Sequence, residues 1–170
     1  FVAVAAILLT GCSASVGPMA TLSSGLGLES PYVAVEASAD LGPVDVLARA
    51  SDATKAGSDQ GGGAFAAAVV AREFGVLELG VGAFSSHQVH DDWTKTTAGA
   101  VARLSIETRR SGIELWLFGP DGDKVEWSAM IRVVGLGRVA PVFEAERVRH
   151  SLGDGDRVGL GVLWKLNTGD

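Results

Sequence analysis

From residue 31 onward, apolar residues alternate with small or polar residues in short segments, and this period of two restricts the fold more than any other feature. One face of segment 158–166 carries Val158, Leu160, Val162, Trp164 and Leu166. Successive side chains of a β-strand point to opposite sides, so the repeat predicts strands with one apolar face. The 23 glycines are spread through these segments, and each would cost about 1 kcal/mol in a helix. The sequence therefore predicts an all-β protein.

The alternation divides the chain into segments separated by glycine, aspartate, serine and proline. We expect strands at 31–40, 43–51, 63–73, 76–86, 95–109, 112–118, 125–135, 138–149 and 156–167. A less regular strand is expected near 19–28, where Leu22, Leu26 and Leu28 alternate with small residues. The predicted fold is an antiparallel up-and-down β-barrel of eight to ten strands, preceded by a signal peptide.

The predicted connections alternate in length along the chain. Short turns are expected at 41–42, 73–75, 110–112 and 135–137, and longer polar loops at 51–62, 86–94 and 150–156. Short turns at one end and longer loops at the other are typical of barrels in the bacterial outer membrane. Several segments also reach about ten residues, which suffices for a tilted strand to cross a bilayer.

Alternation alone does not decide whether the apolar face points inward or toward lipid. The less apolar face is rich in Gly, Ala and Ser, which suit a narrow lumen, and its isolated charges have both signs. The predicted lumen charges are Glu36, Arg49, Glu78, Arg103, Glu107, Glu114, Glu126, Arg132 and Lys165. Buried charges must pair or stay hydrated, so this set predicts either a paired plug or a polar path for small solutes and ions.

Aromatic residues are predicted to mark the edges of the apolar band. Phe84, Trp93 and Trp127 fall near the long-loop ends of their segments, and Trp164 falls toward the opposite rim, as in an interfacial girdle. Trp116 shares a face with Glu114, which does not suit a tryptophan in contact with lipid.

The first residues form an apolar run, Val2 to Leu9, with the length of the apolar core of a secretory signal peptide. Because the chain opens with Phe1 and shows no basic stretch, we expect residues ahead of it. The run ends in Leu9-Thr10-Gly11-Cys12, which resembles the lipobox of bacterial lipoproteins and implies a lipidated Cys12. The alternative is an ordinary signal peptide cut near Ala20.

These features divide the chain into a signal peptide at 1–11, an anchor and linker at 12–30 that contains the irregular first strand, and a β-barrel domain at 31–170. The net charge of −6 argues against binding nucleic acid. A single cysteine excludes an intrachain disulfide and a thiolate zinc cluster.

Candidate chemistry is sparse in this sequence. His87 and His90, followed by Asp91 and Asp92, fit either a divalent-metal site or a solvated polar loop. No Ser-His-Asp arrangement and no glycine-rich loop leading into a helix are recognisable. We therefore expect no enzymatic activity, no catalytic residues, no metal and no cofactor.

The mature part resembles small bacterial outer-membrane β-barrel proteins over most of its length. The resemblance implies export to the outer membrane, contact with its lipid, and a structural or adhesive role or limited passage of small solutes through a narrow or closed, porin-like lumen. The alternative is a lipid-anchored soluble barrel, lipocalin-like in plan, that binds a hydrophobic ligand.

Overall fold

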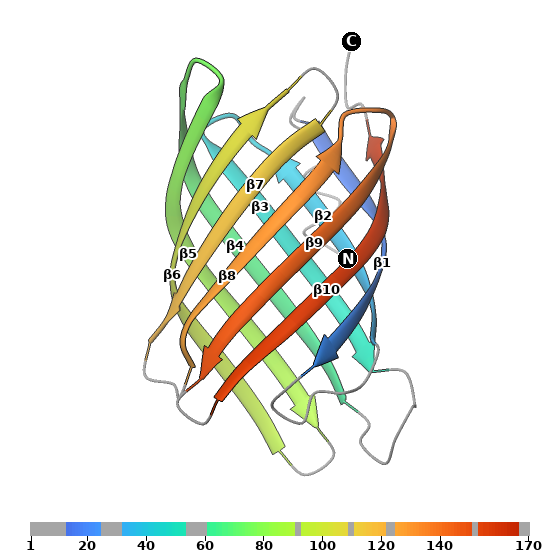
Figure 1. Ribbon diagram of the computed structural model, residues 1–170, viewed down its shortest axis with the longest axis vertical. Coiled ribbons are helices and arrows are strands. Elements are labelled where there is room, and N and C mark those ends of the chain that lie inside the picture. Colours follow the sequence, from blue (N-terminus) through green and yellow to red (C-terminus); the bar gives the residue numbers. More distant parts are fainter. Residues whose placement is uncertain are drawn as a thin grey trace.

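A computed structural model describes residues 13–24, 32–53, 61–90, 93–108, 111–121, 125–150 and 153–166, which form one closed β-barrel (Figure 1). Its strands are β1 (Ser13–Ser24), β2 (Tyr32–Asp40), β3 (Val44–Ala53), β4 (Gly61–Phe74), β5 (Leu77–His90), β6 (Trp93–Glu107), β7 (Ser111–Pro120), β8 (Val125–Gly135), β9 (Val139–His150) and β10 (Gly153–Leu166). Each strand pairs antiparallel with its neighbours in sequence, and β1 also pairs with β10. The predicted up-and-down barrel is confirmed at ten strands.

The described residues include no helix long and apolar enough to cross a membrane.

The first strand lies earlier than predicted, at Ser13–Ser24 rather than 19–28, so the barrel begins within the segment expected to be anchor and linker. Its pairing with β10 is interrupted at Gly17-Pro18, between the pairs Val16↔Trp164 and Met19↔Gly161. Proline has no N–H to donate to a ladder. A Cβ on Gly17 would lie 1.8 Å from the Val162 carbonyl oxygen. The close approach of β10 therefore requires glycine here, and this Gly-Pro pair hid the strand in the sequence.

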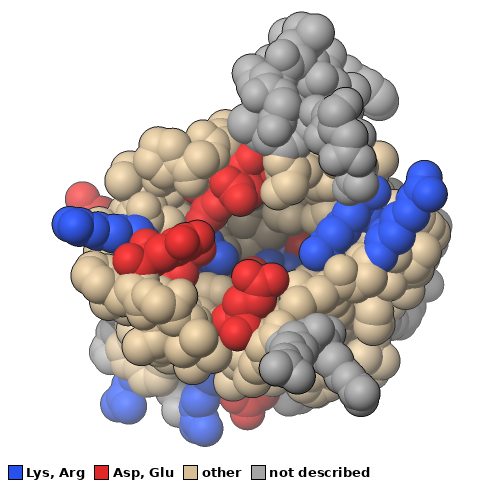
Figure 2. Space-filling model, turned by 90° about the horizontal axis from the view of Figure 1, so that it is seen from above, with Lys and Arg blue, Asp and Glu red and all other residues tan. Residues whose placement is uncertain are grey.

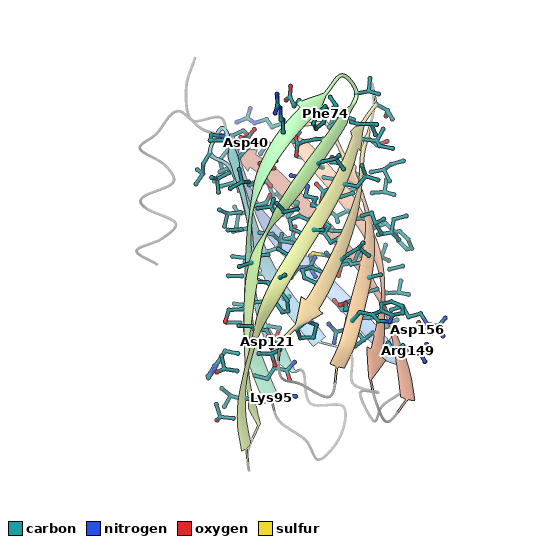
Figure 3. All side chains as sticks on the ribbon, turned by 90° about the vertical axis from the view of Figure 1, so that its left-hand side faces the viewer. Asp40, Phe74, Lys95, Asp121, Arg149 and Asp156 are labelled. Carbon is teal, nitrogen blue, oxygen red and sulfur yellow. The ribbon has the colours of Figure 1, made fainter. Side chains whose placement is uncertain are left out.

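The hairpin between β5 and β6 is longer than predicted. Both strands run through the expected loop 86–94, with His90 paired to Trp93. Valine and threonine favour strands, and the expected loop carries Val89 and Thr94, which pair with each other. This part of the hairpin carries polar residues on both faces. It lies at the end of the barrel where Figure 3 labels Lys95, opposite the end that carries Phe74. The expected loop 150–156 is likewise mostly strand, because β9 ends at His150 and β10 begins at Gly153.

The short turns gather at one end of the barrel, as predicted. The β4–β5 and β8–β9 turns lie at the top of Figure 1, and Gly42 and Gly75 have φ angles of 84° and 70° in the β2–β3 and β4–β5 turns. Only glycine adopts these angles without strain. We call this the short-turn end and the opposite one the long-loop end. Figure 3 places Asp40 and Phe74 at the first, and Asp121, Lys95, Arg149 and Asp156 toward the second.

The aliphatic rows of the strands face outward. Val35 on β2 and Leu160 on β10 are 55% and 62% exposed, and Ile131 on β8 is also exposed. Their sequence neighbours Glu36, Gly159 and Arg132 are buried. The barrel thus has an apolar outer wall and a lumen that holds the charged side chains.

Candidate functional site: the charged lumen

Inward positions on separate strands bring acidic and basic side chains together in the lumen. Each of these residues lies at an even step from the small inward residues of its strand, so the period of two directs it to the interior. At the centre lie Glu36 of β2, Arg49 of β3, Arg132 of β8 and Glu144 of β9. Glu36, Glu144 and Arg132 are 0%, 1% and 2% exposed, so this level of the lumen excludes water from their surfaces.

Arg49 joins two carboxylates from different walls. Its Nε donates to Glu36 Oε2 at 2.8 Å, and its Nη1 donates to Glu144 Oε1 at 3.0 Å. Its Nη2 donates to the second Glu144 oxygen. The two-pronged contact with Glu144 is the bidentate geometry in which arginine binds carboxylates most strongly. Strand β9 is not a sheet neighbour of β3, so this contact crosses the lumen.

Arg132 makes a second crossing at the same level. Its Nη1 donates to Glu114 Oε2 at 3.0 Å, its Nη2 donates to Glu36 Oε1, and its Nε lies 3.5 Å from Glu144 Oε2. Glu36 and Glu144 therefore each contact both central arginines. A buried carboxylate is tolerated only when paired, and this sharing gives both of them two cationic partners.

Arg103 of β6 extends the network toward the short-turn end. Its Nη1 lies 2.7 Å from Glu78 Oε1 and also donates to Asp45, and its Nη2 lies 3.8 Å from Glu114 Oε1. The guanidinium carbon lies 5.5 Å from the centre of the Trp116 ring, within cation–π range. The Trp116 Nε1–H donates to Glu114 Oε2 at 2.9 Å. Trp116 therefore contacts the network inside the barrel and does not lie on the outer wall.

A separate ion pair lies nearer the long-loop end. Arg157 Nη1 of β10 donates to Glu146 Oε2 of β9 at 3.1 Å, and the Ser128 hydroxyl donates to the other Glu146 oxygen.

Apolar clusters occupy the walls on both sides of the network. One lies on β3 to β8 and comprises Leu47, Ala67, Val69, Phe84, Val101, Trp116, Phe118 and Met130. The other lies on β1, β2, β9 and β10 and comprises Met19, Ala34, Ala140, Val142 and Leu163. Apolar side chains therefore pack inside the barrel together with the network. Seen from the short-turn end, basic and acidic groups surround a central hollow (Figure 2).

Six of the nine predicted lumen charges meet in the network: Glu36, Arg49, Glu78, Arg103, Glu114 and Arg132. Glu107 is exposed at the end of β6, which places it outside this buried set. Among the described residues no ion pair is found for Glu107 or Lys165. The side chain of Glu126 lies outside the described residues.

Sequence reasoning missed four lumen charges: Asp45, Glu144, Glu146 and Arg157. The signal was present, because Glu144 and Glu146 alternate with Phe143 and Ala145 in a segment correctly predicted as a strand.

The aromatic prediction was wrong for Phe84. Its ring is buried in the lumen, with its centre 5.3 Å from that of Phe118 and 6.2 Å from that of Phe65. Trp127 and Trp164 do point outward as predicted. The Trp93 side chain lies outside the described residues.

Of the four predicted metal candidates, the structure describes only the His87 side chain. His87 points outward, and its Nδ1 is 2.9 Å from Thr96 Oγ1. The described residues do not include the His90 side chain, Asp91 or Asp92. They also do not include Cys12, the predicted lipidation site. Within the part of the chain that is described, no three His, Cys, Asp or Glu residues are placed to hold a metal ion.

No protein-family model matches the sequence, and no curated protein matches it. Similar solved structures include the N-terminal β-barrel domain of Pseudomonas aeruginosa OprF, with 11% identity, a TM-score of 0.43 and coverage of 91% of this chain and 97% of that chain. Neisserial surface protein A has 9% identity, a TM-score of 0.38 and coverage of 92% and 97%. Ail, the attachment invasion locus protein of Yersinia pestis, has 10% identity, a TM-score of 0.33 and coverage of 93% and 100%. At these values the likeness assigns neither a family nor a function to the chain.

Proposed function

We propose that this chain is a barrel of the bacterial outer membrane whose lumen is closed by its ion-pair network. Its role is then structural or adhesive, with passage limited to small solutes at most. The observation that carries the proposal is the near-complete burial of Glu36, Arg132 and Glu144 inside a wall whose apolar residues face outward.

The height of the apolar band supports a membrane location. Trp164 pairs with Val139, and Trp127 pairs with Arg149, so the two outward tryptophans lie ten residues apart along β9. At about 3.3 Å per residue and a tilt of about 40°, this separation is about 25 Å. That equals the height of the lipid-facing band of outer-membrane barrels, which aromatic residues flank.

The lumen network supports closure. Two arginines join β2, β3, β7, β8 and β9 at one level, and side chains that cross a narrow lumen obstruct the passage of water and ions. Among the described members of the network, five carboxylates face three guanidiniums. Any residual pathway is therefore expected to prefer cations.

The arrangement disfavours the lipocalin-like alternative. A soluble barrel that binds a hydrophobic ligand needs an apolar interior and a polar outer wall. This barrel carries its charged groups inside and exposes valine, leucine and isoleucine outside.

A lipid anchor on Cys12 remains part of the proposal. Ser13, the next residue, begins β1 and pairs with Asp40, which Figure 3 places at the short-turn end. An acyl group on Cys12 would attach to the barrel at that end, which faces the periplasm in outer-membrane barrels.

Recording of ion conductance across planar lipid bilayers tests the closed lumen. We expect the full chain to insert and give no steps above baseline, and the double variant Arg49→Ala/Glu144→Ala to give a small cation-selective conductance. Large ohmic steps from the unaltered protein would overturn the closed-lumen proposal.

A further inference from the structure

The Arg103 guanidinium lies in a cage of acidic and aromatic side chains inside the lumen. It contacts carboxylates from three other strands, Asp45 of β3, Glu78 of β5 and Glu114 of β7. The centre of the Trp116 ring lies 5.5 Å from the guanidinium carbon, within cation–π range. We call these four side chains, Asp45, Glu78, Glu114 and Trp116, the Arg103 cage.

The carboxylates of the cage outnumber the cation that it holds. Glu114 also accepts a hydrogen bond from Arg132 at 3.0 Å, but among the described residues Arg103 is the only basic side chain in contact with Asp45 or Glu78. Both of these carboxylates contact the same nitrogen, Nη1, and within the described part of the chain Glu78 Oε1 is buried without a hydrogen bond. One guanidinium therefore leaves the cage with surplus negative charge and an unsatisfied acceptor.

The cage is more accessible than the central pairs. Glu78 and Asp45 are 27% and 18% exposed, whereas the central carboxylates Glu36 and Glu144 are at most 1% exposed. Figure 2 shows acidic side chains around the hollow at the short-turn end. A solute that enters from this end therefore meets the cage before it meets the buried central pairs.

We propose that the Arg103 cage is a binding site for guanidinium or a similar small organic cation, and that Arg103 is the tethered cation that occupies it. A guanidinium carries N–H donors in one plane, which suits several carboxylates at once, and the face of an indole ring attracts a cation. By filling the cage, Arg103 keeps free cations out of the lumen and so determines which solutes the barrel admits. This inference deepens the proposed closed lumen and rests on it.

The test removes the tethered cation and supplies a free one. The full chain, isotope-labelled and refolded in detergent micelles, is titrated with millimolar guanidinium chloride while NMR follows the indole N–H signal of Trp116, which Trp116→Phe identifies. In Arg103→Ala we expect a saturable shift of this signal. Urea, a neutral molecule of the same shape, and sodium chloride should cause no such shift. The unaltered protein should not respond to guanidinium, because Arg103 fills the cage.

Two further variants serve as controls. Arg103→Ala/Asp45→Asn/Glu78→Gln keeps the space but removes two charged acceptors, so it should bind guanidinium at least about tenfold more weakly than Arg103→Ala. Arg72→Ala removes an exposed arginine that lies over the Phe74 ring and should resemble the unaltered protein.

Several results would overturn the cage as a cation site: no saturable shift in Arg103→Ala, an equal shift with urea, or equal binding by the triple variant. If Arg103→Ala does not refold alone, millimolar guanidinium but not urea should restore its refolding, and failure of this rescue also overturns the site. Large ohmic steps from the unaltered protein in planar bilayers would overturn the closed lumen together with the excluding role of Arg103. A closed barrel whose Arg103→Ala variant ignores guanidinium would overturn this inference alone.

Discussion

Arg132 on β8 donates a hydrogen bond to Glu36 on β2, a residue 96 positions away in the sequence. The two strands share no ladder, so this bond joins opposite walls through the lumen. Arg49 and Glu144, 95 positions apart, make a similar link. The backbone ladder closes the barrel, and these ion pairs connect its walls across the lumen.

Replacing Arg132 with alanine should destabilise the barrel by about 3–5 kcal/mol, because removing one partner leaves Glu36, Glu114 and Glu144 with uncompensated buried charge. Reversible denaturant unfolding in lipid vesicles measures the loss. Arg72→Ala removes an exposed arginine whose described contact is with the Phe74 ring, at 5.6 Å, and should change stability little. A loss below about 1 kcal/mol for Arg132→Ala would show that the network is not buried.

Replacing Gly159 with alanine should displace the Glu144 side chain. A Cβ at this position would lie 2.7 Å from Glu144 Cγ and 2.9 Å from its Oε1, so the carboxylate must move from its arginine partners. Overpacking of this kind costs about 1–3 kcal/mol. The matched control is Gly112→Ala, whose Cβ would approach nothing nearer than the Val134 carbonyl oxygen at 3.9 Å. Equal unfolding free energies for the two variants would contradict this account.

Cys12→Ala should remove any acyl group without releasing the protein from the membrane, because a barrel in the proposed location spans the bilayer without the anchor. Intact-mass measurement of protein extracted from cells tests the first part, and carbonate or urea washing of membranes tests the second. An unacylated native chain would refute lipidation, and a soluble Cys12→Ala variant would instead indicate a barrel held only by its anchor.

The sequence was sufficient to predict the fold because the strands from β2 onward carry a regular alternation of outward and inward residues. Val35 and Leu160 continue outward aliphatic rows, and each follows or precedes an inward residue such as Glu36 or Gly159. The same alternation placed Arg49, Arg103 and Arg132 inside. Alternation is a local pattern between residues that are adjacent in the chain, so it can be recognised in a single sequence.

The remaining features depend on contacts between distant residues. Whether Glu36 pairs with Arg49, Arg132 or both depends on barrel closure and register, which alternation does not specify. A Gly-Pro pair is unusual inside a strand, yet the ladder between β1 and β2 continues through Gly17 and Pro18. Phe84 was predicted to lie at the membrane interface because the inward face of the strands was expected to carry small residues. In the structure, the rings of Phe65, Phe84 and Phe118 pack together on that face.

The exchange of an outward aliphatic residue for arginine tests the central claim, that hydrocarbon surrounds the wall and charge lies within it. Leu160 lies four residues from Trp164 along β10, near the middle of the apolar band, and Val89 lies outward at the end of the β5–β6 hairpin, paired with Thr94. In lipid vesicles we predict that Leu160→Arg lowers the free energy of unfolding by about 2–4 kcal/mol and Val89→Arg by about 0–1 kcal/mol. Equal and small losses at both positions would contradict the claim, because they would place Leu160 in water.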